Sequence, residues 1–414
     1  MLSRGELKAV STVEALREEL FERVKELVKV PTVNPPGEHY QEIAELLARR
    51  LSEIGLEVEI IGVPREELSR YGVELPRSIV VGVLRGSERG RKIVLNGHYD
   101  VVPPGHGWTT DPFQPVVRDG RVYGRGTADM KGAIASMIIA AKAIIESNVA
   151  LKGDLYLTFV PDEETGGHLG SGYLVRRGLI AGDGCIIGEP SGISSVVTAQ
   201  KGALWLELVT LGRAAHGSMP HLGLNAVEKM AKVITAFEKL KEELALLKSR
   251  VGFPEPVRHT TINIGGVIRG GTKVNVVPDS CSCTLDIRVI PEETTETIER
   301  RVREFLESLR EEDPELRYEL RVLERIEPAR TPEDEEIVKA CIRAVEDVAG
   351  RAPTIEGLTG FTDMRWFKEV MPTVIYGPGS MEQAHVPDEY VNLEDLVVAS
   401  KVYLLTIMRF LGYK

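Results

Sequence analysis

Residues 12–191 alternate between segments with the hydrophobic period of a helix and short, continuously apolar segments. Leu16, Leu20, Val24 and Leu27, for example, recur at the spacing of one helix face. The expected helices cover residues 12–29, 40–54 and 131–147, and the expected strands cover residues 56–61, 78–84, 92–95, 155–159 and 185–187. Short apolar strands that alternate with helices predict an α/β fold, a three-layer αβα sandwich.

The pattern changes at about residue 197. The next elements are expected in the order strand, helix, strand, strand, helix, strand, which is the split-βαβ or ferredoxin-like arrangement. They cover residues 201–211, 225–247, 260–268, 279–289, 292–309 and 316–323. This stretch is therefore interpreted as a domain inserted into the first one.

The α/β pattern returns after Pro328. A helix is expected from residue 332, with Thr331 as its N-cap and Pro332 at its first position. The expected elements of this last part are helices at residues 332–348 and 393–411 and a strand at residues 373–376. The predicted organisation is a main domain made of residues 1–196 and 327–414, interrupted by an inserted domain at residues 197–326.

Composition narrows the class of protein. The chain has 414 residues, of which 43% are hydrophobic and 27% charged, as in ordinary globular proteins. Its 62 acidic residues outnumber 51 Lys and Arg, giving a net charge of −11, which argues against a nucleic-acid binder. The N-terminal residues do not resemble an export signal, and the longest apolar stretch, 132–141, is too short to span a membrane. With four cysteines and no CxxC pair, a cytoplasmic protein is expected.

Polar residues capable of metal binding or acid–base chemistry follow several of the expected strands. One strand is followed by His98 and Asp100, and the others by acidic residues or by a glycine-rich turn that ends at a histidine. The set is His98, Asp100, Glu163, Glu164, Glu189 and His385, together with Asp129 just before a helix. Ligands of open α/β sheets bind beyond the carboxyl ends of the strands, so these groups are expected to converge.

The residue types suggest a metal centre. Two imidazoles and three carboxylates (His98, Asp129, Glu164, Glu189 and His385) suit divalent ions such as zinc. One catalytic zinc uses three protein ligands, so five ligands fit two ions better. Such a pair would polarise a substrate carbonyl and lower the pKa of a water to about 7. Taken singly, each residue could be a helix cap, a turn or a surface group; their placement at successive junctions favours a site.

Four segments resemble a known family of metallopeptidases and amidohydrolases. They are HYDVVP at 98–103, GRGTADMKG at 124–132, DEE at 162–164 and GEP at 188–190. The resemblance is to the family of acetylornithine deacetylase, succinyl-diaminopimelate desuccinylase, aminoacylase and glutamate carboxypeptidase, and it spans nearly the whole chain. It implies a three-layer αβα zinc-hydrolase domain with an inserted domain that acts as a lid and a dimerisation surface.

The resemblance also implies roles for the residues. His98, Asp129 and Glu189 would bind one ion, and Asp129, Glu164 and His385 the other, with Asp129 as the bridge. Zn²⁺ is expected, with Co²⁺ or Mn²⁺ as the alternative in one position. Glu163 would be the general base, Asp100 would orient His98, and the peptide bond after Asp129 would be cis.

Further residues match the substrate-binding positions of the family. Segment 212–218 resembles the lid motif, whose histidine, here His216, would reach the site of the partner subunit and polarise the scissile carbonyl. Segment 362–365 resembles the desuccinylase loop more than the deacetylase one, although Phe361 replaces a small residue. The expected substrate contacts are Asn275, Arg288, Thr362, Arg365 and Gly379. Asn275 and Arg288 could instead be strand-surface residues, and Gly379 could belong to a plain turn.

The expected function is metal-dependent hydrolysis of the amide bond of an N-acyl amino acid by a homodimer. A di- or carboxypeptidase of the same family is one alternative, and a non-catalytic metal-dependent binding protein is another. A binding protein would not need Glu163 beside the ligands. Neither a nucleic acid nor a membrane is an expected partner. Which acyl group and which amino acid are used, and whether the native metal is zinc, stay open at this point.

Overall fold

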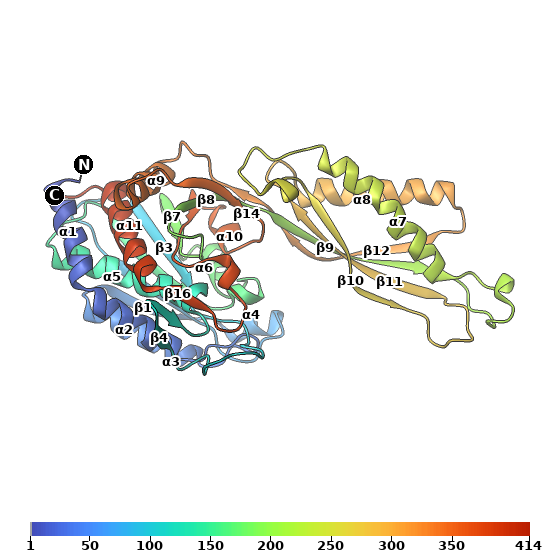
Figure 1. Cartoon of the computed structure of the whole chain (residues 1–414), viewed down its shortest axis with the longest axis horizontal. Helices are drawn as coiled ribbons and strands as arrows, with labels where there is room; N and C mark the ends of the chain where they lie inside the picture. The colour runs from blue at the N-terminus through green and yellow to red at the C-terminus, as the bar shows by residue number, and fades with distance from the viewer. Residues whose placement is uncertain (1) are drawn as a thin grey trace. The chain divides into compact units, whose positions relative to one another are not determined.

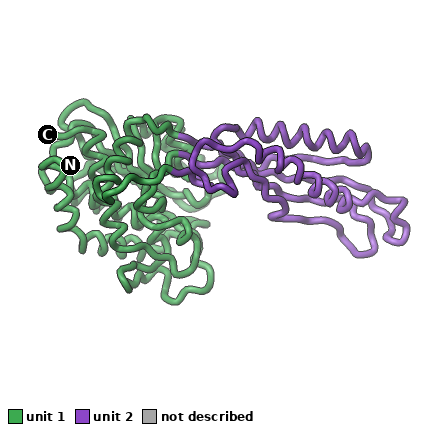
Figure 2. Tube along the Cα trace, turned by 45° about the horizontal axis from the view of Figure 1, so that its top comes forward, with its two compact units in different colours: residues 1–198, 331–355, 362–414 green, residues 199–330, 356–361 purple. Residues whose placement is uncertain are grey.

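The computed structural model describes residues 2–414, which form two compact units (Figure 2). The first unit contains the chain up to Thr198, Thr331–Ile355 and Thr362–Lys414. The second contains Ala199–Arg330 and the short excursion Glu356–Phe361. The sequence division did not foresee this excursion, because the strand that contains residues 356–358 was not predicted.

Six strands of a nine-stranded sheet lie wholly in the first unit and form its centre (Figure 1). The order of the sheet is β1-β2-β6-β3-β7-β15-β8-β13, and β14 pairs with β8. Strand β3 runs parallel to both β6 and β7, and β15 runs parallel to β7. The strands are β1 (Glu57–Gly62), β2 (Ser78–Leu84), β3 (Lys92–His98), β6 (Asp154–Val160), β7 (Gly184–Ile187), β8 (Ser195–Gln200), β13 (Ala329–Arg330), β14 (Thr354–Leu358) and β15 (Thr373–Ile375).

Helices cover both faces of this sheet, which confirms the three-layer α/β prediction (Figure 1). On one face α3 packs on β1 and β2, α5 and α11 on β3, and α9 on β7 and β15. On the other face α10 packs on β15 and α6. The helices are α1 (Arg4–Ala15), α2 (Arg17–Val28), α3 (Tyr40–Glu53), α4 (Arg65–Arg70), α5 (Gly132–Glu146), α6 (Ser171–Arg176), α9 (Glu336–Ala349), α10 (Met364–Phe367) and α11 (Leu393–Leu411). A small sheet, β16-β5-β4, adds β4 (Val116–Arg118), β5 (Arg121–Tyr123) and β16 (Tyr390–Asn392).

Two helix predictions were wrong in their bounds. The single helix expected at 12–29 is two helices that meet at Leu16, and the first begins earlier because Ser3 and Glu6 form a capping box. Thr331 does not cap α9, which begins at Glu336. Instead, the Thr331 hydroxyl donates a hydrogen bond to the carbonyl of Thr373, so the residue ties two segments of the first unit together.

The second unit has the predicted order βαββαβ. Its sheet order is β10-β11-β9-β12, with every neighbouring pair antiparallel. Helices α7 and α8 pack against this sheet, and Leu206, Phe237, Leu285 and Val302 lie in the resulting core. The elements are β9 (Gly202–Leu211), α7 (Ala226–Ala245), β10 (Thr261–Gly270), β11 (Ser280–Val289), α8 (Thr295–Glu312) and β12 (Arg317–Ile326).

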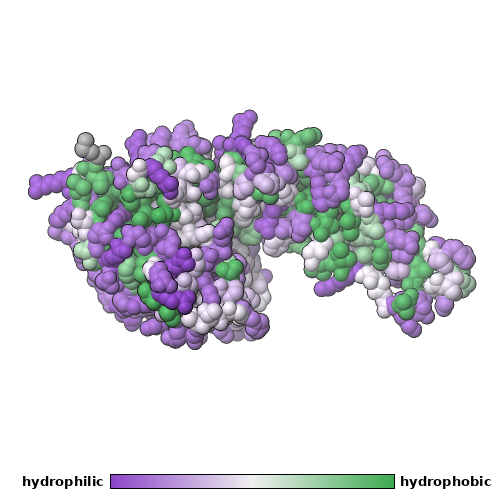
Figure 3. Space-filling view, in the orientation of Figure 1, coloured by the Kyte–Doolittle hydropathy of each residue, from purple (hydrophilic) through white to green (hydrophobic). Residues whose placement is uncertain are grey.

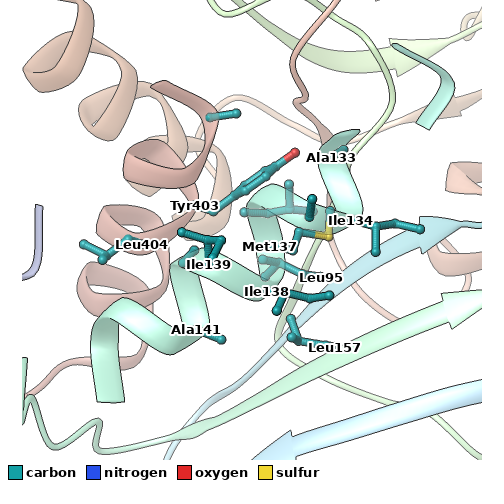
Figure 4. Close-up of a cluster of buried hydrophobic side chains, with 14 of the residues drawn as sticks. Leu95, Ala133, Ile134, Met137, Ile138, Ile139, Ala141, Leu157, Tyr403 and Leu404 are labelled. Atoms are coloured by element: carbon teal, nitrogen blue, oxygen red, sulfur yellow. The ribbon is translucent and has the colours of Figure 1, made fainter. Parts of the chain in front are cut away.

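Helix α5 is the buried centre of the first unit. It is apolar on almost every side, because both of its sides are covered. Strand residues such as Leu95 and Leu157 pack on one side, and Tyr403 and Leu404 of helix α11 pack on the other (Figure 4). The tight packing fixes the start of the helix, which directly follows Asp129 and its neighbours. The core of this unit therefore holds one of the candidate ligands in place.

Replacing Ile138 by alanine should lower the free energy of unfolding of the first unit by about 2–5 kcal/mol. Its side chain is only 1% exposed, so truncation leaves a cavity against the sheet. Denaturant unfolding followed by far-UV circular dichroism measures the change. The control is Leu7→Ala, because Leu7 is 53% exposed and should lose little. Equal losses in both variants would contradict the assignment of α5 to the core.

Hydrophilic side chains cover much of the face of the first unit that is visible in Figure 3, with small hydrophobic patches between them. In residues 2–414, no helix combines the length and the apolar character that crossing a membrane requires.

Candidate active site

Three adjacent strands deliver candidate residues to one edge of the central sheet. His98 is the last residue of β3 and pairs with Val160, the last residue of β6. Glu163 and Glu164 follow β6 directly, in the short helix η2 (Glu163–Thr165). Glu189 comes two residues after the end of β7, on the other side of β3. Because these strands are parallel neighbours, their carboxyl ends bring the side chains together.

The two remaining candidates come from loops. Asp129 lies in η1 (Thr127–Lys131), where its backbone leaves the helical region with φ −120° and ψ 93°. The Asp129–Met130 peptide is cis, as the resemblance implies. His385 lies after β15, in a left-handed conformation with φ 64°. Its side chain is 54% exposed, whereas that of Asp129 is 7% exposed.

Asp129 lies between the two histidines. Its Oδ1 is 3.0 Å from Nε2 of His98, and its Oδ2 is 3.5 Å from Nε2 of His385. His98 Nε2 also lies 3.6 Å from Oε1 of Glu189, and His385 Nε2 lies 3.0 Å from Oε2 of Glu164. Each oxygen of one carboxylate thus faces a different histidine, and each histidine has one further carboxylate beside it.

The hydrogen bond of His98 fixes which ring nitrogen is available as a ligand. Nδ1 lies 3.0 Å from the main-chain carbonyl oxygen of Asp100. A carbonyl oxygen only accepts, so Nδ1 carries a hydrogen, which leaves Nε2, the nitrogen facing Asp129 and Glu189, as the one that could bind a metal. The Asp100 carboxylate is farther away, with Oδ1 3.6 Å from the same nitrogen.

The electrostatics of the group favour cations. Burial and then Glu189 raise the pKa of Glu163 well above its ordinary value, and burial and Asp129 raise that of Glu164 to about 7. Hydrogen bonds to Asp129 and Glu164 raise the pKa of His385 to about 10. The group therefore contains four carboxylates close together and only two imidazoles to offset their negative charge. Divalent cations would relieve this repulsion, and the mixture of imidazole nitrogen and carboxylate oxygen suits zinc-like ions.

Two overlapping groups have ligand atoms close enough to hold a metal ion. One is His98, Asp129 and Glu164, and the other is His98, Glu163 and Glu189, with all ligand atoms of each group within 4.8 Å of one another. Glu163 is thus placed either to bind a metal or to act on a water beside it. The donor set therefore fits two divalent ions.

Asp100 holds the turn that carries Glu163 and Glu164. Its two carboxylate oxygens accept the backbone N–H groups of these residues, each at 3.2 Å, and a hydrogen bond from the side chain of Asn34 at 2.9 Å. Asp100 is fully buried. The sequence prediction included Asp100 but missed Asn34, since no periodicity or strand end marks a residue in the loop between two helices.

Glu389 is a second residue that the sequence prediction missed. It is fully buried and accepts backbone N–H groups from Gly126, Ala128 and Asp129 at 2.8–3.0 Å. The Arg125 guanidinium donates to the same carboxylate at 2.7 Å. Glu389 lies four residues after His385, so it connects the loops of two candidate ligands. Its nearness to His385 in the sequence was the one signal that could have identified it.

Replacing Glu389 by alanine should lower the free energy of unfolding by about 3–5 kcal/mol, because Arg125 would be left buried without its partner. Denaturant unfolding measures the loss. The matched control is Glu394→Ala, since Glu394 is 59% exposed and pairs with Arg17 on the surface, where an ion pair adds little. Similar losses in the two variants would contradict a structural role for Glu389.

The expected substrate residues of the first unit have protein partners of their own. Arg365 donates to the carbonyl of Gly166 and lies over the Trp366 ring at 4.6 Å, so it supports the turn after Glu164. The Thr362 hydroxyl accepts the N–H of Met364 at 3.1 Å. Gly379 has φ 89°, which L-residues rarely adopt. Between Thr362 and Arg365, the sequence prediction passed over Asp363, which is buried and bound by Ser171.

The other expected residues belong to the second unit. His216 and Asn275 are both exposed and lie on paired loops, where the N–H of Gly217 donates to the Asn275 carbonyl at 2.8 Å. Arg288 forms an ion pair with Asp286, with Nε 2.9 Å from Oδ1, and lies over the Phe361 ring at 5.6 Å. A substrate carboxylate would therefore share this guanidinium with Asp286.

Comparison with known proteins identifies the family. Residues 94–409 match Peptidase family M20/M25/M40. The chain belongs to this family. The match covers all five residues grouped around Asp129 and the whole second unit. As a member of Peptidase family M20/M25/M40, a metal-dependent family, the protein is an enzyme that hydrolyses amides.

Relatives within the family include deacylases. The chain is 32% identical to acetylornithine deacetylase of Photorhabdus laumondii, covering 94% of this chain and 97% of the relative. It is 29% identical to N-formyl-4-amino-5-aminomethyl-2-methylpyrimidine deformylase of Bacillus subtilis, with 97% of each covered. An M20 family metallo-carboxypeptidase from Sulfolobus solfataricus shares the fold, with a TM-score of 0.74, 20% identity, and coverage of 95% and 99%.

Proposed function

We propose that this protein is a two-metal deacylase that hydrolyses the amide bond of an N-acyl amino acid. The observation that carries the proposal is the position of Asp129, whose two oxygens face His98 and His385 separately. A carboxylate so placed can bridge two ions, with Glu189 and Glu164 completing the two sets. The similarity to acetylornithine deacetylase supports this choice of substrate class, and the similarity to a deformylase supports deacylation as the reaction.

Two divalent ions, in the first instance Zn²⁺, would polarise the acyl carbonyl and acidify a water. Glu163 takes a proton from that water as its oxygen bonds to the carbonyl carbon. When the carbon–nitrogen bond breaks, Glu163 delivers the proton to the leaving nitrogen, giving a carboxylic acid and an amine, and transfer of the acid's remaining proton to the amine leaves a carboxylate and an ammonium group. A glutamate suits this double role because its carboxylate can accept a proton and later return it.

Substrate recognition is proposed for residues of both units. Arg365 and the backbone at Gly379 in the first unit, and separately Arg288 in the second, are proposed as substrate contacts, since guanidinium groups suit carboxylates. Asn275 and Thr362 would add polar contacts. His216, contributed by the partner subunit of a homodimer, would polarise the acyl carbonyl. A mixture of His216→Ala and Glu163→Gln subunits should then recover activity that neither variant has alone.

The experiment that tests the function is a substrate panel. Amine release is measured for N-acetyl, N-formyl and N-succinyl amino acids and for dipeptides, with chelator-treated enzyme before and after addition of Zn²⁺, Co²⁺ or Mn²⁺. We expect no turnover after chelation and metal-restored turnover on one acyl class. Turnover confined to dipeptides would replace the proposal with a peptidase. Equal turnover with and without metal would overturn the two-metal site.

A further inference from the structure

Asn34 lies in a buried polar cluster behind the candidate active site. It is 2% exposed, and it belongs to the loop between α2 and α3, far in sequence from the residues grouped around Asp129. Its amide nitrogen lies 2.9 Å from Oδ2 of Asp100, 3.1 Å from Oδ1 of Asp162 and 3.0 Å from Oγ1 of Thr165. One buried amide group therefore contacts three residues on two different loops.

These loops are the ones that leave β3 and β6. Asp100 follows His98 after β3, and Asp162 and Thr165 flank Glu163 and Glu164 after β6. The backbone around Asn34 is itself fixed to the first loop, because the N–H of Asn34 donates to the carbonyl of Val101 at 2.9 Å. Asn34 thus connects the loop that follows His98 with the turn that carries Glu164.

The charges in the cluster explain why an amide is needed. Asp100 and Asp162 are two buried carboxylates, and Arg77, which donates to Asp162 at 2.7 Å, is the cation bound to one of them. The amide N–H groups of Asn34 are donors that point at both carboxylates. Without them, the carboxylates would face one another across the cluster with fewer donors, which is unfavourable in a buried environment.

Asn34 does not take part in the chemistry directly, since the polar contacts of its side chain are with Asp100, Asp162 and Thr165. We propose that Asn34 is a positioning residue that sets the place of the Glu163–Glu164 turn relative to His98. This inference rests on the proposed function, because it gives the turn its catalytic importance. Partners of this kind are commonly worth 10–100-fold in metal affinity or activity.

The test compares Asn34→Asp, which keeps the shape but replaces the donors with an acceptor, with Asn34→Ala. We expect kcat to fall by about 10–100-fold in both, with KM changed by less than about threefold. Chelator competition on the Zn²⁺-loaded enzyme should show one ion held about 10–100-fold more weakly and the other nearly unchanged. Hydrogen exchange of the Glu163 and Glu164 amides should be faster, because Asp100 would hold them less firmly.

Two controls separate positioning from general destabilisation. Val345→Ala on α9 removes buried methyl groups away from the polar cluster. It should lower the stability of the protein as the Asn34 variants do, but it removes no hydrogen-bond donor. Tyr40→Phe removes one hydrogen bond to Asp162, at 3.2 Å, and leaves Asp100 and Thr165 untouched. Both should keep kcat, the zinc affinities and the exchange of the turn close to those of the parent.

The inference is overturned if both Asn34 variants keep kcat within about threefold of the parent while Glu163→Gln is inactive. It is also overturned if their losses in kcat only parallel a loss of folded protein, as in Val345→Ala. Near-normal turnover of Glu163→Gln would instead show that the base of the reaction is not Glu163, and absence of metal-dependent turnover on every member of the substrate panel would overturn the proposed function itself. The zinc and exchange measurements do not need a substrate, so unchanged zinc affinities and unchanged exchange in the variants would count against the inference even before a substrate is found.

Discussion

Replacing Glu163 by glutamine is expected to lower kcat by about 10²–10⁴-fold while both metal ions stay bound. Glutamine keeps the shape of the side chain but cannot accept the proton of a water. The parent glutamate can take the proton of a water and hold it between the two halves of the reaction. Turnover on the substrate from the panel and the metal content of the purified variant measure the two effects.

The metal content is the sharper of these two measurements, because Glu163 is also close enough to His98 and Glu189 to bind an ion. The control is Glu189→Gln, which should lose turnover together with metal. If Glu163→Gln loses one ion as well, Glu163 is a ligand and the general base must be sought elsewhere. If it keeps both ions and near-normal turnover, the base is not Glu163.

Replacing Asp129 by asparagine should lower turnover by about 10³-fold or more and, unlike the change at Glu163, should also cause loss of bound metal. The asparagine amide would present an NH₂ group to one of the histidines that now face Oδ1 and Oδ2. It would also remove the negative charge that holds two cations together. Losing ions gives up several kcal/mol of transition-state stabilisation, and each 1.4 kcal/mol is a factor of ten.

Elemental analysis of the variant and turnover in excess Zn²⁺ check this expectation. The control is Asp119→Asn, which makes the same chemical change at a side chain that is 87% exposed. Full metal content in Asp129→Asn would show that Asp129 does not bridge. Recovery of turnover at high Zn²⁺ would show that Asp129 contributes to affinity and not to the arrangement of the ions.

Three of the candidate ligands could be predicted because they lie at the ends of strands. His98, Glu164 and Glu189 each follow an apolar strand, and the register of parallel strands carries such positions to one edge of the sheet. Asp129 and His385 lie on loops, and the structure places them in the same group. Strand patterns are readable because burial on both faces makes these strands continuously apolar.

Other features had no such signal. Asn34 and Glu389 act through hydrogen bonds to backbone or side chains, and neither lies on a strand or helix with a readable period. The start of α9 was misplaced because Thr331 and Pro332 satisfy local capping rules, whereas the Thr331 hydroxyl is used by a distant carbonyl. Tertiary contacts thus overrode local preference at these positions.

The order of strands in the main sheet has a consequence for how the protein is made. Strand β15 lies between β7 and β8, yet it is synthesised only after the entire second unit. The second unit is almost continuous in sequence and has its own core, so it can fold on the ribosome before β15 is made. During that time the edges of β7 and β8 that pair with β15 are still unpaired. Unpaired strand edges of this kind invite aggregation. Residues 373–414 are therefore needed both to close the sheet and to place His385 beside Asp129.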